Sequence, residues 1–422
     1  MIIPKPPEYI RHVMLRLTEN GYDAFLVGGC VRDSIMGRAV HDWDVASSAA
    51  PDEVARLFPV TALTGKKYGT VTVVLPDGTA EVTTFRVESG YNDGRRPDNV
   101  VFVKNLNEDL SRRDFTMNAI AVSIDGKLTD PFGGFKDINK RMIRCVGDPH
   151  TRFSEDALRM FRAFRFSAEL GFTIERKTLE SICANTDKAW TVSAERVRTE
   201  LEKTLLSQYP EKAGEMAAAG LLAKYIDAPV DDPGNRLRRI TALPAEAALR
   251  WCAYCAVLID TESIAAPGDF LRAMRLDANT IKTCKSALSL VANPIDSTAK
   301  AETRHDPVTR SLYDPCKTDC SRIGIKRLLA KHGTDAARCA AAARDTIYGG
   351  SALAITDEII NSGECFSLGA LAVSGSDLTA LGRPPGRGIG LTLARLLDHV
   401  ITRPEDNERE ILLKIIEEPA EQ

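Results

Sequence analysis

The sequence predicts an α+β protein, in which a small sheet with flanking helices comes first and an all-α remainder follows. Within the first 150 residues, three segments are rich in β-branched or aromatic residues and are bounded by Gly, Pro or Asp, as strands are: 24–27, 70–75 and 80–86. The segment Pro76-Asp77-Gly78 joins two of them as a hairpin turn. From about Ser154 onward, apolar residues recur at spacings of three and four, which predicts helices.

Length and charge set the class of protein. The chain has 422 residues, 44% of them hydrophobic, and 55 basic against 58 acidic side chains, so its formal net charge is −3. No apolar run approaches the ~18 residues of a membrane span, and the first residues lack the layout of a signal peptide. We therefore expect a cytoplasmic, globular protein with no membrane contact. The net charge argues only weakly against a nucleic-acid partner, because a local basic stripe is enough to bind phosphates.

Ten cysteines are scattered along the chain, and without a secretion signal we expect reduced thiols. Two pairs are closely spaced, Cys252/Cys255 and Cys316/Cys320, which leaves a structural zinc site as an alternative. The first pair lies in the apolar helical pattern 248–259, where a small buried Cys is an ordinary core residue. We favour the core interpretation.

A phosphate site is predicted at the end of the first strand. The segment 25–33 has the pattern of a strand, a Gly-Gly turn and a helix start. Gly28 and Gly29 allow the backbone to approach a phosphate closely, the helix start offers free N–H groups, and Arg32 adds a forked cation.

A metal site is predicted directly downstream. Asp42 and Asp44 lie two apart in an extended segment, so both carboxylates are expected on one face. Paired carboxylates are ligands that suit Mg²⁺, although an isolated Asp-x-Asp is also typical of a solvated turn. Glu81, on a neighbouring strand, is a candidate third carboxylate, and an outward-facing strand residue is an equally acceptable interpretation.

Two further clusters combine arginines with acidic residues. Adjacent Arg112 and Arg113 predict an anion site with Asp114 as the partner of a guanidinium, and a surface helix is the alternative. On the first long helix, Asp156 and Arg159 are i,i+3 neighbours, and a stripe of arginines at 162 and 165 continues from them. A solvated ion pair is the plain interpretation. An acceptor beside a donor fork also matches the edge that cytosine and adenine share and that guanine and uracil lack.

Six ordered segments carry a family resemblance: Val27–Asp33, Asp42–Asp44, Arg112–Ala119, Asp130–Gly134, Glu155–Arg159 and Ser193–Val197. Together they resemble the class II tRNA nucleotidyltransferases, the CCA-adding enzymes that are grouped with bacterial poly(A) polymerases in the DNA polymerase beta superfamily. The likeness covers roughly residues 20–205 and returns at 373–378 and 385–390.

The resemblance implies a polymerase-beta-like catalytic head with a mixed sheet (1–150), a helical neck that binds the nucleotide base and RNA (151–225), a helical body (226–365) and a tRNA-binding tail (366–422). It also implies that Asp42 and Asp44 bind Mg²⁺, and Glu81 stays a candidate catalytic carboxylate beside them. The sugar and phosphates would be held by Gly28, Gly29, Arg32 and Arg113. The incoming base would pair with Asp156 and Arg159, which Arg162 and Arg165 would support.

The implied activity is template-independent addition of C, C and A to the 3′ end of tRNA by two-metal nucleotidyl transfer, with CTP and ATP as substrates and pyrophosphate as product. Residues 90–98 resemble the family's flexible loop for the switch from C to A addition. A poly(A) polymerase and an enzyme that adds only A remain alternatives, as does a non-catalytic RNA-binding protein on the same scaffold. A phosphohydrolase is less favoured, because the pairs His41-Asp42 and His305-Asp306 lack further nearby histidines.

Overall fold

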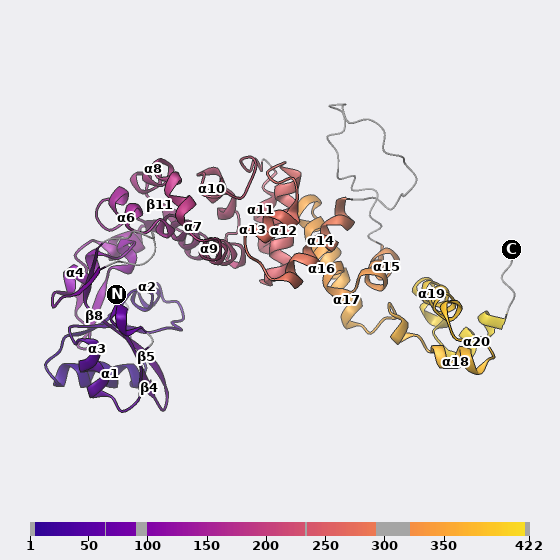
Figure 1. Cartoon of the computed structure of the whole chain (residues 1–422), viewed down its shortest axis with the longest axis horizontal. Helices are drawn as coiled ribbons and strands as arrows, with labels where there is room; N and C mark the ends of the chain where they lie inside the picture. Colours follow the sequence, from indigo (N-terminus) through magenta and orange to yellow (C-terminus); the bar gives the residue numbers. More distant parts are fainter. Residues whose placement is uncertain (1–4, 64, 90–98, 233, 293–320, 418–422) are drawn as a thin grey trace. The chain divides into compact units, whose positions relative to one another are not determined.

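The computed structural model describes residues 5–63, 65–89, 99–232, 234–292 and 321–417 (Figure 1). The chain divides into two compact units: Met1–Thr204 with Glu215–Lys224, and Leu205–Gly214 with Tyr225–Gln422. Across these described ranges, no helix is long and apolar enough to cross a membrane. The finer division into head, neck, body and tail stays a prediction.

The first unit is built on a seven-stranded sheet with the strand order β3-β4-β5-β2-β1-β8-β9. Strands β2 and β5 run parallel and the other neighbours run antiparallel, so the sheet is mixed, as expected. The strands are β1 (Ala24–Val27), β2 (Asp44–Ser47), β3 (Thr61–Ala62), β4 (Thr70–Leu75), β5 (Gly78–Thr84), β8 (Ala121–Ser123) and β9 (Leu128–Thr129). Helices α1 (Glu8–Glu19), α2 (Gly29–Ile35) and α3 (Pro51–Leu57) accompany it.

The strand predictions hold with one correction. β1 and β4 have the predicted bounds, and the β4–β5 hairpin turns at Pro76-Asp77-Gly78, with Leu75 opposite Gly78. The strand expected at 80–86 instead ends at Thr84, and Arg86 opens a separate strand, β6 (Arg86–Ser89), which pairs with β7 (Asn99–Phe102). Phe85, between the two strands, is fully buried in the core cluster that includes Val27 and Leu110.

Most of the remaining elements of the first unit are helical. They are α4 (Leu106–Ser111), η2 (Thr116–Asn118), α5 (Gly134–Asn139), β10 (Met142–Ile143), α6 (Pro149–Glu155), α7 (Leu158–Leu170), β11 (Thr173–Ile174), α8 (Arg176–Ala184), η3 (Thr186–Thr191) and α9 (Ala194–Leu206). α7 buries the predicted apolar residues Leu158, Phe161, Phe164 and Ala168. The remainder is not entirely helical, because β11 pairs in parallel with β10.

The described residues of the second unit form α-helices joined by turns and short 3-10 segments. The α-helices are α11 (Arg236–Arg239), α12 (Ala247–Asp260), α13 (Pro267–Ala273), α14 (Ala278–Ala292), α15 (Arg322–His332), α16 (Thr334–Tyr348), α17 (Ala352–Asn361), α18 (Gly375–Ala380), α19 (Arg387–Thr402) and α20 (Arg409–Glu417). Helix α10 (Lys212–Ala218) lies where the two units divide the chain. Cys252 and Cys255 are fully buried in α12, as core residues are. Among the residues described, no group of three or more His, Cys, Asp or Glu side chains is arranged to hold a metal ion. Cys316 and Cys320 lie outside them.

Candidate active site

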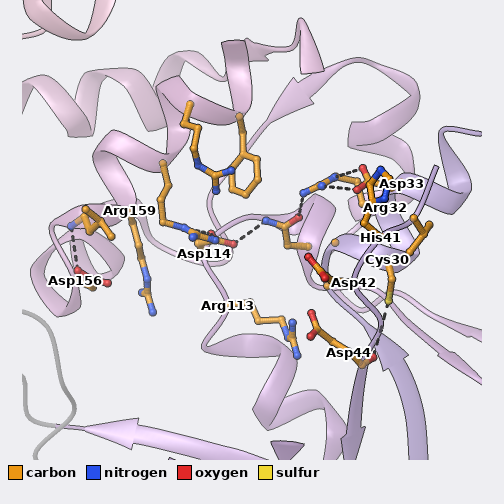
Figure 2. Close-up of a pocket in the computed structure, with 18 of the residues that line it drawn as sticks. Cys30, Arg32, Asp33, His41, Asp42, Asp44, Arg113, Asp114, Asp156 and Arg159 are labelled. Atoms are coloured by element: carbon orange, nitrogen blue, oxygen red, sulfur yellow. Dashed lines mark hydrogen bonds and ion pairs between the residues drawn. The ribbon is translucent and has the colours of Figure 1, made fainter. Parts of the chain in front are cut away.

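A cleft of about 680 Å³ in the first unit gathers most of the predicted site residues (Figure 2). Its walls come from the β1–α2 turn, the segment leading into β2, the segment after α4, and the α6–α7 region. The cleft brings together Gly28, Gly29, Arg32, Asp42, Asp44, Arg113, Asp156, Arg159, Arg162 and Arg165. Glu81 is the predicted site residue that does not line it.

The Gly-Gly turn forms as predicted and lies against the acidic end of the cleft. Gly28 has a φ of +75° and precedes α2, a backbone conformation that favours glycine. A Cβ atom at this position would lie 3.2 Å from Arg113 Nη1 and 3.5 Å from Asp44 Oδ2. A side chain here would press on the end of Arg113 and meet Asp44 at an ordinary contact distance, so the positive φ is the main reason for glycine at this position.

The two aspartates do not both belong to strand β2. Asp44 is the first residue of β2, whereas Asp42 lies in the exposed segment before it. Both still line the same cleft, and Figure 2 shows Asp42, Asp44 and Arg113 directed toward a common space.

The charge around Asp44 suits a cation. Burial raises the pKa of Asp44, the nearby Arg113 lowers it, and the negative charges of Glu81 and Asp42 raise it further. Glu81 is directly opposite Asp44 in the parallel β2–β5 pair, although its own side chain is exposed. Mg²⁺ is commonly held by one or two carboxylates together with substrate phosphates. The donor set of Asp42 and Asp44 fits that ion.

Arg32 lies inside a buried polar network. It is only 7% exposed, forms an ion pair of 2.9 Å with Asp33, and donates to Asn118 Oδ1 at 2.8 Å. Asn118 in turn donates to Asp114 Oδ1 at 3.0 Å, and the other oxygen of Asp114 accepts from Arg162 at 2.7 Å. Although burial disfavours the charged carboxylate, Arg162 and Asn118 hold the pKa of Asp114 well below its usual range.

Asp114 is therefore not the partner of the adjacent arginines, contrary to the prediction. Arg113 Nη2 lies 3.2 Å from Asp109 Oδ2, and Arg112 Nη2 lies 2.8 Å from Asp109 Oδ1. Neighbouring side chains on a helical turn diverge, whereas residues three and four apart meet, so Asp109 is the residue within reach. In the described part of the chain, Arg113 Nε is buried without a hydrogen-bond partner, whereas Arg113 Nη1 lies beside the Gly28 turn that lines the cleft.

Asp156 and Arg159 do not form the ion pair that the plain interpretation of their spacing would give. The helix is interrupted at Asp156, whose carboxylate accepts from the Leu158 backbone N–H at 3.0 Å at the start of α7. Asp156 pairs instead with Arg196 at 3.0 Å. Arg159 pairs with Glu155 at 2.6 Å and donates to the Arg112 carbonyl at 2.9 Å. Both residues face the cleft, but from separate elements.

The predicted arginine stripe on α7 is largely buried. Arg165 is 8% exposed and lies between Glu200 at 2.6 Å and Glu169 at 2.8 Å. A solvated face is thus excluded for Arg159, which pairs with Glu155, and for Arg165, which pairs with two carboxylates.

Two protein-family models match stretches of this chain. Residues 24–144 match the Poly A polymerase head domain, and residues 171–226 match the probable RNA and SrmB-binding site of polymerase A. A CCA-adding enzyme of Limosilactobacillus fermentum is 36% identical over 98% of this chain and 97% of its own length. A CCA-adding enzyme of Geobacillus kaustophilus is 37% identical over 96% of each chain. This chain belongs to the CCA-adding enzyme family.

Solved structures agree with this membership. The crystal structure of the Bacillus stearothermophilus CCA-adding enzyme in complex with CTP aligns with a TM-score of 0.74 at 33% identity, covering 98% of each chain. The Thermotoga maritima CCA-adding enzyme complexed with tRNA has the same fold, with a TM-score of 0.69 at 20% identity.

The sequence did not predict roles for two residues that line the cleft of this CCA-adding family member, Asn118 and Arg196, or for Asp109, which binds Arg113 without lining the cleft. Asp109 was detectable, since it stands three and four residues before Arg112 and Arg113. Asn118 and Arg196 lie within the ordered motifs, but nothing in those motifs indicates their partners. Arg196 is 40 residues from its partner Asp156, a separation that no local pattern signals. The loop at 90–98 and the pair His305-Asp306 lie outside the described residues.

Proposed function

We propose that this protein adds C, C and A in turn to the 3′ end of tRNA, using CTP and ATP and releasing pyrophosphate. The observation that carries the proposal is the meeting of Asp42, Asp44 and Arg113 beside the Gly28 turn in one cleft. Carboxylates for a cation next to donors for a triphosphate are what nucleotidyl transfer requires. Family membership supplies the substrate class, because the relatives are CCA-adding enzymes.

Enzymes of this family use divalent metal ions, and we propose Mg²⁺ held by Asp42 and Asp44. When bound, Mg²⁺ supplies positive charge that activates the tRNA 3′-hydroxyl and stabilises the leaving pyrophosphate. Arg113 would direct its Nη1, which lies beside the Gly28 turn, to a phosphate or ribose oxygen. Gly28 and Gly29 would let the triphosphate approach the backbone, and Arg32 would fix this wall through its bonds to Asp33 and Asn118.

Base choice is proposed to lie with Asp156 and Arg159. A carboxylate accepts a hydrogen bond from an exocyclic amino group, and a guanidinium donates to a ring nitrogen, which matches cytosine and adenine. In the structure these two side chains bond to Arg196 and Glu155, so a base would have to exchange for, or share, existing contacts. Arg162 and Arg165 would support α7 through Asp114 and Glu200.

A gel assay tests this function. Transcripts of one tRNA lacking the last three, two or one nucleotides are incubated with CTP, ATP or both. We expect two additions with CTP alone on the shortest substrate and completion only when ATP is also present. Long A tracts would identify a poly(A) polymerase, addition only to the transcript ending in CC would identify an A-adding enzyme, and no extension would favour a non-catalytic RNA-binding protein. We also propose that the protein is cytoplasmic, because its substrates tRNA, CTP and ATP occur there.

A further inference from the structure

Asp109 is a buried acid in direct contact with an arginine of the cleft. It is 0% exposed and lies on α4, where Leu110 packs in the core cluster with Val27 and Ala46. It does not line the cleft, so it cannot touch a nucleotide. Its effect on the reaction must pass through the side chains it binds.

The two oxygens of Asp109 have different partners. Oδ1 accepts from the Arg86 backbone N–H at 3.3 Å and from Arg112 Nε and Nη2 at 3.0 and 2.8 Å. Oδ2 accepts from Arg113 Nη2 at 3.2 Å. The contacts on Oδ1 tie the carboxylate to the start of β6 and to α4 itself, so Asp109 is a fixed anchor and Arg113 is the partner that it holds.

Arg113 stands between two acidic groups. Its Nη2 binds Asp109, while its Nη1 lies beside Gly28 on the side of Asp44 Oδ2. Its charge is near enough to lower the pKa of Asp44, yet among the described residues no ion pair joins Arg113 to Asp42 or Asp44. A guanidinium attracted to both sides will bind the carboxylates of the cleft if its anchor is removed.

We propose that Asp109 is a positioning residue that holds Arg113 away from Asp42 and Asp44, and so keeps these carboxylates available to the cation. This inference rests on the proposed function for its significance. Its test, however, needs neither nucleotide nor tRNA. Without the anchor, Arg113 occupies the negative charge that a divalent ion would otherwise bind, and cation affinity falls.

Asp109→Asn is a selective change. The amide oxygen can still accept from Arg86 and Arg112, whereas the amide nitrogen, a donor, faces Arg113 Nη2 and repels it. Binding of Mn²⁺ to the full-length, nucleotide-free protein is measured by electron paramagnetic resonance. We expect the dissociation constant for Mn²⁺ to rise about tenfold, equivalent to ~1.4 kcal/mol. An unchanged dissociation constant overturns the proposal.

A second substitution separates positioning from loss of structure. In the double variant Asp109→Asn/Arg113→Gln, no guanidinium remains to compete for the carboxylates, so Mn²⁺ affinity is expected to return to the wild-type value or better. Double-mutant coupling of this kind isolates the pair. A double variant that binds Mn²⁺ as weakly as Asp109→Asn contradicts the competition. If Asp109→Asn fails to fold, Mn²⁺ binding is measured on the single variant Arg113→Gln. Weaker Mn²⁺ binding by this variant than by the wild type would overturn the proposal that Arg113 competes with the cation.

Asp137→Asn is the matched control. Asp137 is also a buried aspartate of the first unit, 2% exposed and paired with Arg144 at 2.7 Å, but neither residue lines the cleft. This variant is expected to lose a similar amount of stability and to keep the wild-type Mn²⁺ affinity. Failure of the wild-type protein to extend tRNA would contradict the proposed function and leave the Mn²⁺ result to judge Asp109 separately.

Discussion

The sequence indicates which residues of the cleft are functional candidates. It often does not indicate which partners those residues bind. Gly28, Asp44 and Arg113 have side chains or backbone conformations that only a few residue types provide, and such residues stand out in a sequence. Their partners depend on how chain segments meet. Adjacency suggested Asp114 for Arg113, whereas Asp109 binds it and Asp114 binds Arg162, 48 residues away. Contacts across that separation arise from packing, which local patterns do not encode.

Base choice is the property that Asp156 is expected to control. Asp156→Asn replaces an acceptor with a group that also donates, so a uracil carbonyl gains a partner and a cytosine amino group loses charge assistance. We expect the preference for CTP over UTP to fall by about tenfold to a hundredfold, in line with ~1–3 kcal/mol for a good bidentate contact. Single-nucleotide incorporation with each of the four NTPs measures it.

The matched control for that experiment is Asp187→Asn, an equally conservative change at an exposed position on η3. Its selectivity is expected to equal that of the wild type. An unchanged order of the four NTPs in Asp156→Asn would refute the assignment of base pairing to this carboxylate.

At the level of elements, the strands, the β4–β5 hairpin and the apolar pattern of α7 followed from periodicity and turn residues. The interruption between α6 and α7 did not, because Asp156 also fits a helical surface position by spacing. Its carboxylate caps the Leu158 N–H, and Asp is a preferred residue at helix starts. The residue type at position 156 therefore indicated a helix start. The spacing of Arg159, Arg162 and Arg165 after it favoured one continuous helix instead.

The α7 helix is joined to the segment after α4 by the ion pair between Asp114 and Arg162. Because the folded-state pKa of Asp114 is lowered, its ionisation stabilises the fold above the pKa of the unfolded chain, ~3.9, and this contribution is lost as pH falls toward the folded-state value. Asp114→Asn is expected to lower the free energy of unfolding at pH 7 by ~1–3 kcal/mol. Below pH 4 the difference in free energy of unfolding between the variant and the wild type should become smaller.

Urea unfolding at pH 7 and at pH 3 measures this gap. Asp77→Asn is a suitable control, since Asp77 is exposed in the turn between β4 and β5. A gap that stays constant from pH 7 to pH 3 would show that the ionised Asp114 contributes nothing to stability.

For the whole molecule, a net charge of −3 conceals a local distribution. Carboxylates collect beside the proposed metal position, and arginines line the rest of the cleft. In the second unit, Arg383 and Arg387 flank the turn between α18 and α19, and Arg387 is exposed. Phosphate contacts depend on such positions rather than on the total charge.

Arg387→Ala is accordingly expected to weaken tRNA binding by a fewfold at low salt and less at high salt. Each lost phosphate contact should reduce the slope of log affinity against log salt by roughly 0.7–0.9. Filter binding of tRNA over a salt series provides the slope. Arg56→Ala, an exposed arginine on α3 that belongs to no predicted site, serves as control. Equal slopes for wild type and Arg387→Ala would exclude a phosphate contact there.

We propose that the cleft at Asp42 and Asp44 performs nucleotidyl transfer, with the carboxylates of these two residues as the cation ligands. The most direct measurement is the single-turnover rate of CMP incorporation into tRNA lacking its last three nucleotides, for wild type and for Asp42→Ala. Because Asp42 is exposed, the variant is expected to unfold at the wild-type urea concentration. We predict a loss of rate of at least ~10³-fold, equivalent to ~4 kcal/mol. A folded variant that incorporates CMP within tenfold of the wild-type rate would contradict the account.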